Sequence, residues 1–168
     1  LAIAFALFAV AAARAEDYPV PQEPNQIFYV QRSLNPNTVV YAARLQNGRL
    51  DPKRPVEVYW RRYNDDGERK ELSSIESRFA FGVRAEPVKD QPGTFKVSVV
   101  SYPKRAATLR LVDGVPRLEI SVGGVPARLD HAYLEVDDSG SVPSVLRVDL
   151  YGFALETGAP VKESFIPK

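Results

Sequence analysis

The sequence predicts an all-β protein, a single antiparallel meander of about eight to ten strands with one short helix, and it favours a barrel over a sandwich. From Gln26 onward, short runs rich in β-branched and aromatic residues recur at intervals of roughly 8–12 residues. Pairs such as Asp113-Gly114 and Gly123-Gly124 separate these runs and are typical of the tight turns that join antiparallel strands.

The strands follow one another in the order that these turns dictate. The turn Leu34–Asn37 separates the first two, and Asn64–Gly67 ends the aromatic third strand. The expected strands are Ile27–Ser33, Thr38–Gln46, Val56–Tyr63, Thr94–Tyr102, Thr108–Val112, Arg117–Val122, Ala127–Val136, Val145–Phe153 and Val161–Ile166.

One segment carries two periodicities. In and just after Arg69–Ser77, Leu72 and Ile75 lie three residues apart and Phe79 follows four residues later, a spacing typical of a helix. From Phe79 to Val88 they alternate, as in a strand. We therefore expect a brief helix to about Ser77, then a strand to Val88, followed by the hairpin loop Lys89–Gly93.

The N-terminal 15 residues, LAIAFALFAVAAARA, predict an export signal. An apolar run closed by Ala13-Arg14-Ala15 has the small residues that a signal peptidase reads. Because the run lacks a starting Met and a basic first segment, we expect the signal peptide at 1–15 to be truncated. A Pro-rich spacer at 16–25 and one all-β domain at 26–168 are expected to follow it. The expected location is periplasmic or extracellular, with no transmembrane segment in the mature chain.

Composition excludes several function classes. Loss of residues 1–15 would remove one of the 22 basic residues and leave the 21 acidic ones, so the mature domain would be neutral. A neutral domain lacks the positive field on which nucleic-acid binding depends. With no cysteine and a single histidine, His131, the chain offers neither disulfides nor a zinc ligand set. We expect no cofactor, no metal site and no catalytic residue.

The candidate binding residues are Arg32, Trp60 and Arg62. Alternation places Arg32 on the apolar face of the first strand, and it places Trp60 and Arg62 on the apolar face of the third. In a meander these two strands run the same way, so both arginines would lie at one rim of the sheet. Guanidinium groups beside an apolar wall suit an amphiphile with an anionic head, although rim arginines also simply reach past such a wall to water.

Four stretches of the chain resemble the family called domain of unknown function 4833. They are FYVQRSLNPNTVVYAARL (28–45), RPVEVYWRRY (54–63), RFAFGVRA (78–85) and VDLYGFALETGAPVKESFIP (148–167). The resemblance implies a single-domain bacterial protein that often carries an export signal. The family has no assigned activity, so the resemblance implies no catalytic or binding residue.

The expected function is an exported, non-enzymatic binding protein that holds an apolar or amphiphilic small molecule in or at the mouth of a β-barrel. An alternative is a structural or interaction module of the cell envelope that binds protein or glycan through the aromatic–arginine strand, with Tyr59 and Arg61 facing outward. A hydrolase using His131 is a third reading, although no Gly-x-Ser-x-Gly motif supplies a nucleophile. The sequence leaves the oligomeric state open.

Overall fold

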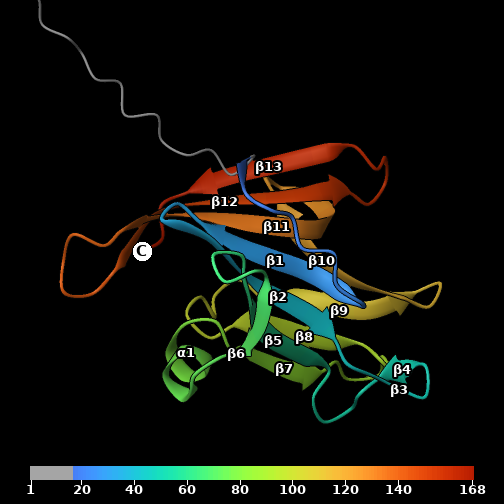
Figure 1. Ribbon diagram of the computed structural model, residues 1–168. Helices are drawn as coiled ribbons and strands as arrows, with labels where there is room; N and C mark the ends of the chain where they lie inside the picture. Colours follow the sequence, from blue (N-terminus) through green and yellow to red (C-terminus); the bar gives the residue numbers. More distant parts are fainter. Residues whose placement is uncertain (1–16) are drawn as a thin grey trace, which may run out of the picture.

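A computed structural model describes residues 17–168 and confirms the all-β prediction (Figure 1). It contains thirteen strands and one six-residue helix in the described residues. In chain order they are β1 (Gln26–Arg32), β2 (Asn35–Ala43), β3 (Leu45–Gln46), β4 (Arg49–Leu50), β5 (Val56–Arg62), β6 (Glu68–Glu71), α1 (Ser74–Phe79), β7 (Val83–Pro87), β8 (Phe95–Val99), β9 (Ala107–Val112), β10 (Val115–Val122), β11 (Val125–Asp137), β12 (Ser144–Ala154) and β13 (Pro160–Phe165).

The main sheet branches at β11. Along its full length β11 pairs with β12, which in turn pairs with β13. The opposite edge of β11 pairs first with β10 and then, from His131 to Leu134, with β1. One branch is therefore β1-β2-β5-β6, and the other is β10-β9-β8-β7. A register shift between Leu129 and His131 marks the place where the branches part.

The predicted antiparallel meander is wrong in one respect, because β1 and β11 are parallel and the sheet is mixed. This pairing joins segments about a hundred residues apart in sequence, which turn signals between neighbouring strands cannot reveal. The strand count also exceeds the expected eight to ten: eleven strands form the main sheet, and β3 and β4 form a separate two-stranded sheet.

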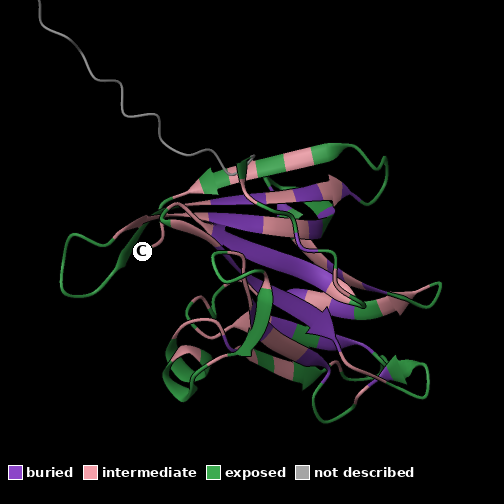
Figure 2. Ribbon diagram, in the orientation of Figure 1, coloured by how far each residue is buried: buried purple, intermediate pink, exposed green. Residues whose placement is uncertain are grey.

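The two branches curl toward each other into a half-barrel that stays open, so the expected closed barrel is not formed (Figure 1). Strands β5 and β7 come within 8 Å between Cα atoms but do not pair. Figure 2 shows buried residues concentrated in β1 and β2, whereas β6 and β13 are largely exposed.

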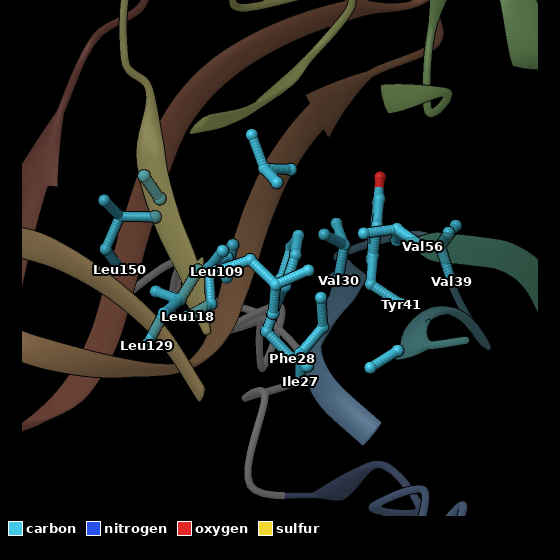
Figure 3. Close-up of a cluster of buried hydrophobic side chains, with 14 of the residues drawn as sticks. Ile27, Phe28, Val30, Val39, Tyr41, Val56, Leu109, Leu118, Leu129 and Leu150 are labelled. Carbon is cyan, nitrogen blue, oxygen red and sulfur yellow. The ribbon is translucent and has the colours of Figure 1, made fainter. Parts of the chain in front are cut away.

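The core fills the concave side of this half-barrel. Alternation turns Phe28, Val30, Tyr41 and Trp60 inward from one branch. The other branch and the β11–β12 stem supply Leu109, Leu118, Leu129 and Leu150, and Figure 3 shows most of these side chains packed against one another. Tyr41 is fully buried, stacks on Phe28 with ring centroids 4.1 Å apart, and donates a 2.8 Å hydrogen bond to the carbonyl of Phe81.

The expected helix is displaced along the chain. The part expected to begin the helix is instead β6, which pairs with the end of β5. The helix starts after Ser73, whose side chain accepts a hydrogen bond from the amide of Glu76 while the Glu76 carboxylate accepts one from the amide of Ser73. This capping box fixes the N-terminus of α1 more strongly than apolar spacing alone.

The N-terminal segment, for which the sequence predicts a spacer, packs on the convex face. Pro21 is fully buried, and Glu23 forms an ion pair with Arg61 at 2.6 Å. Tyr18 donates a hydrogen bond to the carbonyl of Ser33, and Gln31 donates one to that of Pro19. The predicted signal peptide, 1–15, lies outside the described residues. Within residues 17–168 no helix has the length and apolar character needed to cross a bilayer.

Candidate functional site

Strand register brings the two candidate arginines to one rim of the half-barrel. Strand β2 runs antiparallel to both β1 and β5, so these two point the same way. Val30, Val39 and Trp60 form a row across the three strands on the concave face. Arg32 and Arg62 each follow this row by two residues, which places both at the end of their strands.

These residues line a pocket of about 440 Å³, called here the arginine pocket. Arg32, Trp60 and Arg62, the three residues expected from the sequence, meet there. The pocket also contains side chains that the sequence did not indicate: Asn37, Lys70, Glu71, Ser73 and Glu76. The motif Ser73-x-x-Glu76 predicts a helix start, but only the fold brings that helix start beside Trp60.

Arg32 is a partly desolvated cation in this pocket. Its guanidinium carbon lies 4.9 Å from the centroid of the Trp60 ring, a cation–π contact. Its buried Nε has no hydrogen-bond partner among the described residues. Burial lowers the pKa of Arg32, while the nearby charge of Glu76 acts in the opposite direction. An anion entering the pocket would supply a counter-charge for this guanidinium.

Arg62 is held by a single acid. Its Nη2 lies 2.9 Å from a carboxylate oxygen of Asp65 in the following turn. Its Nε is buried and, like that of Arg32, lacks a partner among residues 17–168. Arg62 is thus paired with Asp65, whereas no carboxylate lies within ion-pair distance of Arg32 in the described chain.

The two carboxylates of the pocket are already engaged. One oxygen of Glu76 accepts from Trp60 Nε1 at 3.3 Å, and the other accepts from the amide of Ser73 at 2.8 Å. Burial opposes ionisation of this carboxyl, but the hydrogen bonds from Ser73 and Trp60 prevail and lower its pKa. Glu71 pairs with Arg69 at 2.9 Å. Neither Glu71 nor Glu76 forms an ion pair with Arg32 or Arg62 in the described residues.

An apolar cavity of about 220 Å³ lies beside the arginine pocket, between the two branches and the stem. The two spaces share a wall. Trp60 lines the pocket, Phe81 lines the cavity, and their rings meet edge to face with centroids 5.2 Å apart. Arg32 is also the register partner of Leu134, which lines the cavity. Figure 3 shows Phe28, Val30 and Tyr41 of the cavity wall.

A set of contacts between the β8–β9 loop and the C-terminal strand closes one side of the cavity. Tyr102 stacks on Phe165 with centroids 5.6 Å apart, and Arg105 forms a two-pronged ion pair with Glu163. The Arg105 hydrogen bonds, with one from the amide of Gly123, lower the pKa of Glu163 to about 2 against a smaller effect of burial. These contacts are called the latch below.

His131 lies on the opposite, convex face. Its ring stacks between those of Tyr29 and Tyr151, at centroid distances of 4.9 and 4.3 Å. Its Nδ1 lies 2.7 Å from a carboxylate oxygen of Asp130. No serine is among the contacts found for His131 in the described chain, and no group of three or more possible metal ligands occurs in residues 17–168.

Comparison with known proteins identifies the family. The family model described as "Domain of unknown function (DUF4833)" matches residues 28–164, which is most of the chain and nearly all of the sheet. No curated protein and no solved structure matches the chain. The chain belongs to the DUF4833 family.

Proposed function

We propose that this protein is an exported, non-enzymatic binding protein for an amphiphile with an anionic head group and a single apolar chain. The head group binds Arg32 and Arg62, and the chain enters the apolar cavity past Trp60. Export is inferred from the apolar run and small-residue cleavage pattern of residues 1–15.

One observation carries this proposal. Two arginines line a pocket that shares a wall with an apolar cavity, and Arg32 has no carboxylate within ion-pair distance among the described residues. A partly buried charge without an ion-pair partner is costly for folding, and such a cation is suited to binding an anion. Planar guanidinium groups pair well with carboxylate and phosphate, whereas the cavity offers the apolar surface that a hydrocarbon chain prefers.

The sizes of the two spaces favour a small amphiphile. The cavity of about 220 Å³ is smaller than the roughly 300–1,000 Å³ of typical small-molecule sites. Together with the arginine pocket of about 440 Å³ it falls within that range. The combined space therefore suits one chain and one head group better than a two-chain lipid.

The opposite face supports the alternative function less well. Tyr59, which would have to be exposed to bind protein or glycan, is only 2% exposed. Arg61 is occupied by Glu23, and Arg69 covers the Tyr59 ring at 3.7 Å from its centroid. The aromatic–arginine strand is thus used within the molecule, by its own N-terminal segment and by β6.

The fluorescence of Trp60 provides a direct test, because it is the single tryptophan of the chain and lines the pocket. Dodecyl phosphate, added below its micelle concentration, should change this fluorescence and saturate at one molecule per chain. Dodecyltrimethylammonium, with the same chain and a cationic head, should bind at least about tenfold more weakly, because like charges face each other.

Substitutions then locate the head group. The double variant Arg32→Gln with Arg62→Gln should weaken dodecyl phosphate binding by about tenfold or more, since it removes two charge-assisted contacts. Arg49→Gln, an exposed arginine in the β3–β4 hairpin, is the matched control and should leave the affinity unchanged. Equal affinity for the two amphiphiles, or no loss in the double variant, would falsify the proposal.

A further inference from the structure

The half-barrel leaves two strand edges facing each other across an open seam. One edge is β7, which pairs only with β8. The other is the first half of β5, because β6 pairs with β5 only from Tyr59 onward. No strand in the described chain pairs with either edge within the seam. Exposed edges of this kind are templates for an additional strand.

The hydrogen-bond ladder shows which groups of β7 face the seam. The amide of Val88 donates to the carbonyl of Thr94, and the amide of Val100 donates to the carbonyl of Gly82. In an antiparallel pair such hydrogen-bonded positions alternate. The even-numbered residues of β7 therefore bond to β8, and Val83 and Ala85 direct their N–H and C=O groups into the seam.

The same reasoning applies to β5. The amide of Arg44 donates to the carbonyl of Pro55, so Pro55 and Glu57 are the positions that face β2. Val56 and Val58 consequently direct their backbone groups toward the seam. Counted through the sheet, β5 and β7 run in the same sense, so a strand between them can be antiparallel to both.

The seam encloses a pocket of about 720 Å³ with two chemical characters. Val58, Leu72, Val83 and Ala85 are partly buried apolar residues that pack against the core. The charged residues that line it are four bases (Arg44, Lys53, Arg54 and Arg69) and two acids (Glu57 and Glu71). Both acids pair with Arg69, so these six charged residues leave a net excess of two positive charges on the side of Arg44, Lys53 and Arg54. The carboxylate of Asp51, which interacts with Arg44 and Arg54, reduces this excess.

We propose that this seam binds an extended acidic peptide segment, which inserts between β5 and β7 as an additional antiparallel strand. Its main chain pairs with the free groups of Val83 and Ala85, and its alternate apolar side chains cover the core beside Val58. Its carboxylates face Arg44, Lys53 and Arg54. This is strand addition, a recurring mode of peptide recognition.

The size of the seam agrees with a short segment. An extended residue within a sheet occupies on the order of 160 Å³, given a rise of about 3.4 Å, a strand spacing of about 4.8 Å and a layer about 10 Å thick. A pocket of about 720 Å³ therefore accommodates about four residues. Two strands that flank a third lie roughly 9.6 Å apart. Because Cα atoms of β5 and β7 approach within 8 Å, insertion of a strand requires β5 and β7 to move apart.

The probe for this site is a fluorescein-labelled heptapeptide that alternates valine and glutamate. Its fluorescence anisotropy should rise on addition of the full chain, and a peptide that alternates valine and lysine should bind at least tenfold more weakly. In hydrogen exchange, the bound acidic peptide should protect the amides of Val56, Val58, Val83 and Ala85.

Substitutions distinguish this edge from the other free edge. Ala85→Pro removes an amide that faces the seam but none that bonds to β8, and it should weaken binding by roughly fivefold to tenfold. Ser164→Pro in the other free edge, β13, is the matched control. The amide of Ala154 donates to the carbonyl of Ala159, so the odd-numbered residues of β13 bond to β12. The amide of Ser164 therefore faces away from β12, as that of Ala85 faces away from β8. Arg54→Glu should weaken binding of the acidic peptide by about tenfold, because it replaces a positive charge with a negative one.

Several outcomes would overturn the proposal. They are equal binding of the two peptides, protection of β13 in place of β7, or a loss caused by Ser164→Pro and not by Ala85→Pro. A concentration-dependent dimer that Ala85→Pro abolishes would instead assign the seam to a second copy of the chain. Because neither the peptide nor these variants touches Arg32 or Arg62, failure here leaves the amphiphile proposal standing.

Discussion

At the scale of residues, Arg32 gains few contacts in the fold, which agrees with the proposal that it binds an anionic head group. Its guanidinium is partly desolvated, has an unpartnered Nε, and gains only a contact with Trp60 and the nearby charge of Glu76. A cation–π contact contributes on the order of 1 kcal/mol, and desolvation of the charge offsets a comparable amount. Folding alone therefore gives no strong reason for an arginine at this position.

We expect Arg32→Gln to change the free energy of unfolding by less than about 1 kcal/mol, because the lost contact and the relieved desolvation nearly cancel. Urea unfolding followed by circular dichroism measures this. A loss of about 3 kcal/mol or more would show that Arg32 holds the fold together, and its role in binding would then need another explanation.

The sequence predicts the position of Arg32 and Arg62 correctly, although it does not predict their surroundings. Alternation along Ile27–Ser33 and Val56–Tyr63 is enough to place Arg32 and Arg62 on the concave face at one rim, and the structure does so. Alternation says nothing of Lys70 or Glu76, because their approach to Trp60 depends on how β6 and α1 fold back over β5.

At the scale of elements, the latch joins the β8–β9 loop to β13 over the apolar cavity. The pKa of Glu163 falls from 4.5 in the unfolded chain to about 2 in the fold, chiefly through the hydrogen bonds from Arg105. A carboxyl with a depressed pKa stabilises the fold fully above its unfolded pKa. That contribution is then lost as the pH falls from about 4.5 through about 2.

We therefore expect Glu163→Gln to lower the free energy of unfolding by on the order of 1 kcal/mol at neutral pH, a value reduced for solvent screening. The difference from the unsubstituted protein should shrink below pH 4.5 and vanish near pH 2. Glu156→Gln, in the exposed β12–β13 turn, is the control and should show no such trend. A difference that does not vary with pH would contradict a contribution from the charge of Glu163, and no difference at all would mean that the Tyr102–Phe165 stack alone holds the latch.

The elements themselves were predicted unevenly. Strands with a buried face, such as β1 and β5, were found within a residue or two, because alternation reports burial directly. Strand β6 was missed because all four of its residues are exposed and charged, so its sequence carries no alternation. It forms because the turn after β5 returns the chain alongside its partner.

At the scale of the whole molecule, branching at β11 explains why the sheet encloses a cavity without closing. Two branches leave one edge of β11 in succession, and each contributes half of the concave wall. Gly152, the register partner of Leu129 at the fork, lies so close to its neighbour that a Cβ there would meet the carbonyl oxygen of Arg128 at 2.6 Å. No local pattern in the sequence indicates this fork, since it depends on a parallel pair between distant segments.

In the proposed complex, the arginine pocket and the apolar cavity together hold one anionic amphiphile. Native mass spectrometry of the full chain, recovered after export by its own cell, tests this most directly. We expect a chain beginning at Glu16 that carries one single-chain anionic amphiphile, and loss of that molecule in the Arg32→Gln, Arg62→Gln double variant. A ligand-free mass that dodecyl phosphate does not alter, or a ligand that the double variant retains, would contradict it.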